Sequence, residues 1–92
     1  KTYALHQNLP NPFNPITIIN FDLPNESNVK LSVYDILGRS VKELVNQKQS
    51  PGFKSIKWDA TNNFGKRVSA GLYIYSIEAE NFRQTKKMVL LK

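Results

Sequence analysis

Few residues of this chain have the types and the spacing that catalysis or metal binding requires. His6 is the one histidine, it has no nearby cysteine or carboxylate, and the chain has no cysteine, so disulfide bonds and thiolate metal sites are excluded. Seven Asp and Glu residues are scattered among thirteen Lys and Arg residues, with no recognisable general acid–base pair, nucleophile elbow or phosphate-binding glycine loop. We therefore predict that the chain is not an enzyme and binds no cofactor.

The densest polar pattern is WDATNNFGKRVSAGLYIY, residues 58–75. Asp59 and Asn62 offer oxygen ligands of the kind calcium accepts, but a single carboxylate is a weak donor set for a divalent cation. The alternative is a long crossover between strands, in which Asx turns and glycines with positive φ shape a polar loop around one apolar residue. We favour the crossover and predict no metal site. The motif residues that we single out are Asp59, Gly65, Val68, Gly71 and Tyr73.

Residues 8–15, NLPNPFNP, form a second unusual stretch, called the Pro-rich segment below. Proline fixes its own φ, lacks a backbone donor and keeps the preceding residue out of the helical region. The segment is therefore predicted to be a stiff, extended connector, with Phe13 as the one bulky side chain able to anchor it on a core. A rigid linker and a recognition motif both remain open. The candidate motif residues are Asn11, Pro12, Phe13 and Pro15.

Alternating apolar and polar residues indicate the elements that position these motifs. The alternation predicts strands over residues 16–23, 28–35, 54–59, 72–79 and 83–92. Residues 40–48 are ambiguous, because Ser40 and Glu43 resemble a helix capping box, and our prediction there is a strand. The pattern as a whole predicts an all-β fold, an immunoglobulin-like antiparallel β-sandwich of about seven strands.

Length and charge narrow the class of protein. Ninety-two residues suit one domain, and the net charge of +6 is concentrated in residues 53–92, which hold eight basic and three acidic residues. No segment is apolar enough to span a bilayer and none has a signal-peptide layout, so direct membrane insertion is not expected. Nucleic acid is not expected either, because the cations are not interleaved with stacking aromatic residues. Trp58 alternates in phase with Ile56 and is predicted to lie in the core.

Together, the ordered motifs resemble a known family. NLPNPFNP, TIINFDLP, VKLSVYDILGR, the Trp58–Asp59 pair, GKRVSAGLYIY and KKMVLLK resemble the C-terminal sorting domain, type A, of cargo proteins of the type IX secretion system. The resemblance covers residues 8–92. The sandwich is also similar to the immunoglobulin-like module of the flagellar hook-capping protein, which shares the Trp–Asp and GxY patterns.

The resemblance implies a secretion signal. Residues 1–15 would be a proline-rich leading segment and linker to an upstream cargo domain on the same chain, and residues 16–92 the sorting sandwich. The partners implied are the outer-membrane type IX machinery and a surface sorting peptidase that usually removes the domain. The location implied is the periplasm in transit, then the cell surface or the extracellular space. A stiff Pro-rich segment would hold the linker away from the sandwich and accessible to cleavage.

The tail, residues 86–92 (KKMVLLK), has two interpretations. As a strand it places Lys86, Met88 and Leu90 on one face and Lys87, Val89 and Leu91 on the other, so apolar residues occur on both faces. One interpretation is an edge strand protected by lysines. The other is a docking site for an acidic, apolar groove of the secretion apparatus, in which a cationic rim surrounds an exposed apolar pair. That rim would be formed by Lys86, Lys87 and Lys92 around Val89 and Leu91.

Two other functions remain open at this stage. A carbohydrate-binding accessory module would need a planar row of exposed aromatic side chains. The available aromatic residues lie on different segments of the chain. They are Tyr3, Tyr34, Phe53 and Phe64. A purely structural immunoglobulin-like spacer is the second alternative, and it requires no exposed site.

Overall fold

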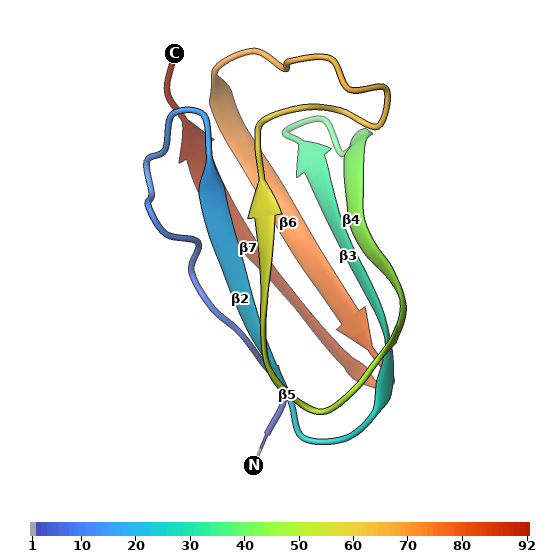
Figure 1. Ribbon diagram of the computed structural model, residues 1–92. Helices are drawn as coiled ribbons and strands as arrows, with labels where there is room; N and C mark the ends of the chain where they lie inside the picture. The colour runs from blue at the N-terminus through green and yellow to red at the C-terminus, as the bar shows by residue number, and fades with distance from the viewer. Residues whose placement is uncertain (1) are drawn as a thin grey trace.

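The computed structural model describes residues 2–92, and this part of the chain contains strands and turns but no helix. Seven strands form two antiparallel sheets that pack face to face (Figure 1). A three-stranded sheet has the order β1-β2-β5, and a four-stranded sheet has the order β4-β3-β6-β7. The all-β sandwich predicted from alternation is confirmed. The strands are β1 (Ala4–Leu5), β2 (Thr17–Leu23), β3 (Ser27–Asp35), β4 (Ser40–Gln49), β5 (Gly52–Trp58), β6 (Gly71–Ala79) and β7 (Phe82–Leu90).

The core lies between the two sheets and is built from the inward positions of the alternating strands. In β2 every second residue is buried, and in β6 the alternate residues from Tyr73 to Ala79 are all buried. Trp58 is 1 % exposed and lies 5.5 Å, ring centre to ring centre, from Tyr73. The prediction that Trp58 is a core residue is therefore confirmed, and its ring is not available to stack on a ligand.

The ambiguous segment, residues 40–48, belongs to β4, as predicted. Its helix-like spacing has a structural cause, because the pairing of β3 with β4 shifts register between Leu31 and Ser32 and again between Val33 and Tyr34. An irregularity of this kind places an extra residue on one strand and interrupts the period of two. Three β4 side chains at apparent helical spacing therefore all pack against the core: Val41, Leu44 and Val45.

The described residues that precede β2 pack against the sandwich. Ala4 and Leu5 pair with Asp22 and Phe21 of β2, and Leu5 is 3 % exposed. The chain then bends at residues 10–12 and 14–15, so the Pro-rich segment is not the extended connector that the prolines predicted. The physical reason is the hydrophobic effect. Burial of the Leu5 and Phe13 side chains in the core lowers the free energy of the chain, whereas an extended linker would leave both side chains in water. The division at residue 15 into a linker and a sorting domain stays a prediction.

The molecule is elongated, with principal extents of 37 × 22 × 20 Å. The C-terminus, the Pro-rich segment, the β3–β4 turn and the β5–β6 loop lie at one end, which we call the loop end (Figure 1). The first described residues lie at the opposite end. Residues 2–92 contain no helix of the length and apolarity needed to cross a membrane.

Candidate functional site

The Pro-rich segment and the tail, the two motifs farthest apart in sequence, are bonded to each other at the loop end. Phe13 and Leu90 form a parallel bridge. Five hydrogen bonds connect residues 7–14 with residues 87–92 along the outer edge of β7. They run from Gln7 Nε2 to Lys87 O (2.7 Å), from Val89 N to Asn11 Oδ1 (3.0 Å), from Phe13 N to Val89 O (3.0 Å), from Leu91 N to Phe13 O (2.8 Å) and from Asn14 Nδ2 to Lys92 O (3.0 Å).

Phe13 anchors this contact in the core. Its side chain is 1 % exposed, and its ring lies 5.7 Å from the ring of Trp58. A buried polar network holds the bend beside it: Asn8 Nδ2 donates to Thr17 Oγ1 at 3.0 Å, and Thr17 Oγ1 donates to Pro10 O at 2.9 Å. Each of these buried groups has a partner, as burial requires. The bend is therefore fixed by packing and hydrogen bonds together.

The hydroxyl of Tyr75 connects β6, in the four-stranded sheet, to His6 and Asn8 near the start of the chain. Sequence reasoning missed this role. The hydroxyl donates to His6 O at 2.7 Å and accepts the backbone N–H of Asn8 at 2.8 Å. The side chain is fully buried, and this burial raises the pKa of Tyr75 to about 12. The sequence held one signal for this role. Tyr75 alternates in phase with buried residues of its strand, and a buried phenol hydroxyl needs a hydrogen-bond partner.

The two lysines that begin the tail lie on opposite faces of β7. Lys86 shares the half-buried face that continues into Met88 and Leu90, whereas Lys87 shares the exposed face with Val89. The predicted rim of Lys86, Lys87 and Lys92 around one apolar pair is therefore corrected, because strand alternation removes Lys86 from it. The end of β7 is also not a bare edge, since the Pro-rich segment covers it.

Side chains of β6 lie beside the exposed residues of the tail, because β6 and β7 are paired. Leu72 pairs with Val89, and Ile74 pairs with Lys87. Leu72 is 40 % exposed, Val89 36 % and Leu91 50 %. The outer face of β6 and β7 at the loop end therefore presents an apolar surface beside Lys87.

The β5–β6 loop is the polar crossover that the sequence predicted. Asn62 Oδ1 accepts the N–H groups of Phe64 (2.9 Å) and Lys66 (3.0 Å) in an Asx turn, and Trp58 Nε1 donates to Thr61 O at 2.9 Å. Gly65 and Gly71 both have positive φ. Val68 packs partly against the core, and Tyr73 OH donates to Ser69 O at 2.6 Å.

Asp59 has a structural partner in this loop. The hydroxyl of Thr61 donates to Asp59 Oδ1, and this bond lowers the pKa of the Asp59 carboxyl. Within residues 2–92, the structure brings no three His, Asp or Glu side chains close enough together to hold a metal ion. Asp59 Oδ1 accepts the hydroxyl of Thr61, and Asn62 Oδ1 accepts two backbone N–H groups of the loop.

The turn between β3 and β4 is held by several hydrogen bonds and has an apolar tip. Asp35 Oδ1 accepts the N–H groups of Leu37 (2.9 Å) and Arg39 (3.0 Å), and Asp35 Oδ2 accepts Arg39 Nε at 2.8 Å. The backbone N–H of Arg39 is the main cause that lowers the pKa of Asp35. Gly38 permits the turn with φ of 82°. Ile36 and Leu37 are 64 % and 73 % exposed.

His6, Tyr3 and Phe53 lie away from the loop end, whereas Phe64 belongs to the β5–β6 loop. His6 Nε2 lies 2.9 Å from Asp22 Oδ2, so the prediction that His6 has no nearby carboxylate was wrong, because β1–β2 pairing brings the two residues together. Phe53 and Phe64 are both exposed, but they lie at opposite ends of the molecule, and Tyr3 stacks on Phe82 at 5.5 Å. The structure therefore does not assemble these aromatic residues into one platform.

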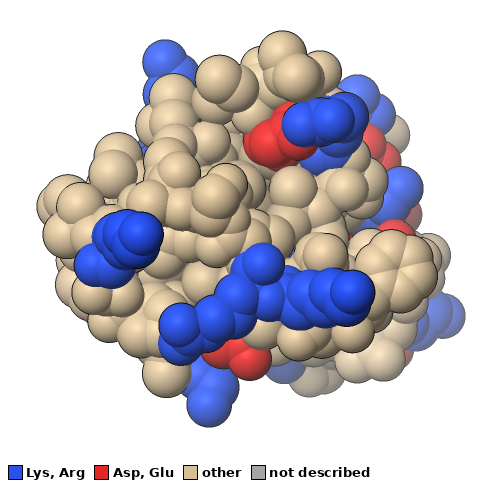
Figure 2. Space-filling model, turned by 90° about the horizontal axis from the view of Figure 1, so that it is seen from above, with Lys and Arg blue, Asp and Glu red and all other residues tan. Residues whose placement is uncertain are grey.

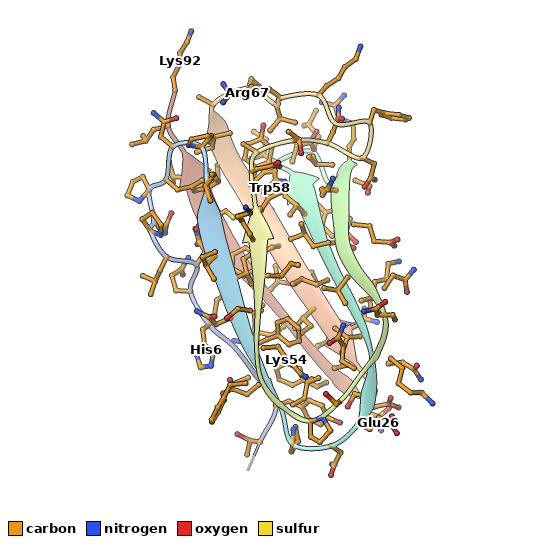
Figure 3. The ribbon with its side chains drawn as sticks, in the orientation of Figure 1. His6, Glu26, Lys54, Trp58, Arg67 and Lys92 are labelled. Carbon is orange, nitrogen blue, oxygen red and sulfur yellow. The ribbon has the colours of Figure 1, made fainter. Side chains whose placement is uncertain are left out.

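Two hollows flank the ridge of residues 68–70 at the loop end. The first, of about 580 Å³, lies between this ridge and the β3–β4 turn. The second, of about 260 Å³, lies on the side of Pro15, Leu91 and Lys92. Figure 2 views this end and shows Lys and Arg side chains across it with few acidic neighbours. Arg67 and Lys92 both project from it (Figure 3).

Several solved structures share this fold. PorU of Porphyromonas gingivalis, in its dimeric latent form, is 22 % identical over 99 % of this chain with a TM-score of 0.74. PorZ, an essential surface component of the type IX secretion system of Porphyromonas gingivalis, is 17 % identical over 98 % with a TM-score of 0.64. This chain spans 10 % of the PorU chain and 11 % of the PorZ chain. FlgD of Xanthomonas campestris, studied for flagellar hook capping, is 20 % identical over 95 % of this chain and 65 % of its own, with a TM-score of 0.65.

At these identities the structural likeness shows the fold alone, and comparison with curated proteins gives no significant sequence match. A family profile does match, over residues 15–82, which is most of the sandwich. The matched stretch includes β2 to β6 and stops at the first residue of β7, so it leaves out most of the Pro-rich segment and the whole tail. On the strength of that match, the chain belongs to the FlgD Ig-like domain family.

Proposed function

We propose that this domain is a secretion signal that directs a larger cargo protein across the outer membrane through the type IX secretion system. In this proposal the domain acts by binding and carries out no catalysis. It passes through the periplasm and reaches the cell surface or the extracellular space, where a sorting peptidase removes it from the cargo. Its partners are the outer-membrane secretion machinery and that peptidase.

The bonded contact between the Pro-rich segment and the tail is the observation that carries this proposal. Both segments lie almost wholly outside the stretch matched by the FlgD Ig-like family profile, yet four hydrogen bonds and the burial of Phe13 fix them against each other. A sandwich that served only as a spacer would not need a structured contact of this kind. Two segments that lie outside the profile match and are bonded to each other at one end of the fold are best explained by recognition at that end.

Sequence motifs and relatives support the same function. The ordered motifs resemble type A sorting domains, and PorZ, a component of the type IX system, has the same fold. The flagellar relatives share the sandwich, so the fold alone does not distinguish secretion from assembly. The distinction rests on the ordered sequence motifs, above all those of the Pro-rich segment and the tail, which the family profile does not match.

The exposed side of the tail has the composition of a binding surface. Val89, Leu91 and Leu72 provide apolar area, while Lys87 and Lys92 provide positive charge around it. Apolar contact supplies affinity at interfaces, and charge complementarity accelerates encounter. The partner surface is therefore expected to be apolar and acidic.

Export of a reporter tests the proposal. Residues 1–92 would be fused to the C-terminus of a soluble reporter in a bacterium that has the type IX machinery, and the reporter would be located by fractionation. We expect the reporter in the medium or at the surface, and we expect Lys87→Glu combined with Val89→Ser to retain it in the periplasm. Phe53→Ser is the matched control, because Phe53 is 91 % exposed at the opposite end.

A truncation alone is not an adequate test. Removal of residues 88–92 deletes Met88 and Leu90, which are 0 % and 4 % exposed, so the domain would lose core packing as well as its docking surface. The double substitution leaves both residues in place. A folded wild-type fusion that stays in the periplasm would contradict the proposed function.

A further inference from the structure

The β3–β4 turn holds an apolar tip in an exposed position. Two backbone N–H groups and the side chain of Arg39 donate to the Asp35 carboxylate and fix the turn, and Ile36 and Leu37 project from it with 64 % and 73 % of their surfaces exposed. A turn needs no apolar side chains for its own geometry. A rigid turn that displays two of them is preorganised for contact, because little conformational entropy is lost when it is covered.

A hollow lies beside this tip. Its apolar lining comes from Val41, Val68 and Leu72 together with Leu37, and its volume is about 580 Å³. The ridge of residues 68–70 separates it from the second hollow, of about 260 Å³, beside Leu91. Residues 68–70 line both hollows, so the two hollows are neighbours, and Leu91 and Lys92 of the tail line the second one.

The charges around the two hollows are mostly positive. Arg39 lines the first hollow, and Arg67 and Lys92 line the second (Figure 3). The nearby carboxylate of Asp35 is already bonded to Arg39 and to the turn backbone. Figure 2 shows the resulting excess of Lys and Arg over Asp and Glu at this end. Charge complementarity therefore favours an acidic partner.

We propose that the loop end binds an acidic, extended polypeptide segment of a partner protein, with one apolar side chain in the hollow beside Leu37 and another in the hollow beside Leu91. A polypeptide fits better than a lipid surface, because two separate hollows accept individual side chains whereas a bilayer presents a flat boundary. The proposal extends the docking surface from the tail to the β3–β4 turn. It rests on the proposed function only for the identity of the partner as part of the secretion apparatus.

The first test uses a defined probe on the isolated chain. A synthetic peptide of alternating Glu and Leu residues would be titrated into the isotope-labelled domain and followed by NMR amide shifts. We expect shifts at Leu37, Leu72 and Leu91, with a loss of at least half of the shift amplitude in the Leu37→Asn variant. Phe53→Asn, at the opposite end, should respond like the parent. A peptide of alternating Lys and Leu should produce no shifts at these positions.

Three results would overturn the inference. The first is equal response to the acidic and the basic peptide, which would mean nonspecific apolar contact. The second is binding to vesicles that contain phosphatidylglycerol but not to the acidic peptide, which would identify a lipid partner. The third is a shift pattern at the loop end that depends only on the concentration of the domain itself, which would identify a second copy of the chain as the occupant.

The second test separates this inference from the proposed function. In the reporter fusion, Ile36→Asn with Leu37→Asn should reduce export by roughly tenfold, as expected for loss of an interface contact of central importance, while the melting temperature stays unchanged. Normal export of this variant would overturn the inference and leave the secretion function intact. Failure of the wild-type fusion to leave the periplasm would overturn the secretion function, and the peptide titration would still decide on the binding surface.

Discussion

The side-chain Oδ1 of Asn11 accepts the backbone N–H of Val89 at 3.0 Å, although 78 residues separate the two in sequence. This bond explains the composition of the Pro-rich segment. Proline has no N–H to give to a neighbouring strand, so a segment with three prolines cannot pair with β7 as a regular strand would. The side chains of Asn11 and Asn14 supply bonds to the tail in addition to those of the backbone: Asn14 Nδ2 donates to Lys92 O, and Asn11 Oδ1 accepts the N–H of Val89.

Replacement of these two asparagines is predicted to loosen the tail without unfolding the sandwich. In Asn11→Ala with Asn14→Ala, each lost hydrogen bond should cost about 0.5–1.5 kcal/mol. Hydrogen exchange at the Val89 amide should become faster, because that N–H loses its acceptor. Asn46→Ala is the control, since Asn46 lies exposed on β4. Unchanged exchange at Val89 in the double variant would contradict this explanation of the asparagines.

Phe13→Ala is predicted to destabilise the whole domain. Phe13 is 1 % exposed and lies against Trp58, and truncation of a buried Phe to Ala typically costs about 3–5 kcal/mol. Chemical denaturation would measure the change in free energy of unfolding. Phe53→Ala removes the same atoms at a site that is 91 % exposed and should change stability by less than about 0.5 kcal/mol. Similar losses in the two variants would show that Phe13 is not a core residue.

Much of the fold could be predicted from the sequence, because alternation reports directly which strand face is buried. The inward residues of β2 and β6 and the burial of Trp58 follow from this local rule. Residues 40–48 were harder to assign, since the register shifts against β3 break the period of two. Local patterns carry no information on such pairings between distant segments.

The candidate site could be predicted only in part for the same reason. The Pro-rich segment and the tail were both recognised as unusual, but nothing in either stretch indicates that they contact each other. The partner of His6 depends on β1–β2 pairing, and the side of β7 that Lys86 occupies depends on which alternate face meets the core. The exposed tip at Leu37 was missed, because an apolar residue in a turn has no periodic signal.

Tyr75→Phe is predicted to weaken the connection between the leading residues and the four-stranded sheet. It leaves the buried N–H of Asn8 and the carbonyl of His6 without the phenol hydroxyl, which should cost roughly 1–3 kcal/mol. Denaturant midpoints would measure this loss, and Tyr34→Phe on the outer sheet face is the matched control. Equal stability of Tyr75→Phe and the parent would contradict the proposed role of the hydroxyl.

The same phenol predicts a loss of stability at alkaline pH. Burial raises the pKa of Tyr75 to about 12 from an ordinary value of 10.0, so the folded chain holds this proton more tightly than the unfolded chain. The corresponding stabilisation is complete below pH 10.0 and is lost as the pH rises towards about 12. Ultraviolet titration should reveal one tyrosine that ionises near pH 12 and is absent from Tyr75→Phe. If the titration finds no tyrosine of this kind, the Tyr75 hydroxyl is more accessible to solvent than its hydrogen bonds imply.

The β3–β4 turn is predicted to open in acid. The Asp35 carboxylate accepts the N–H groups of Leu37 and Arg39 and the side chain of Arg39, and these bonds hold its pKa below the ordinary value of 3.8. The stabilisation is therefore present above pH 3.8 and is lost as the pH falls through the lower pKa of the folded state. Asp35→Asn should loosen the turn at every pH, because an amide cannot replace all three charge-assisted bonds.

NMR would follow this opening through the Asp35 carboxyl carbon and the amide protons of Leu37 and Arg39 in one titration. Arg39→Gln distinguishes the two sources of the effect, because it removes the guanidinium but keeps the backbone N–H that contributes most to the lowered pKa. We expect Asp35 in that variant to titrate between its parental midpoint and 3.8. A midpoint at or above 3.8 would mean that the ion pair, and not the turn backbone, holds the carboxylate. The tip of Ile36 and Leu37 would then depend on an exposed ion pair that salt screens, and its rigidity would fall with ionic strength.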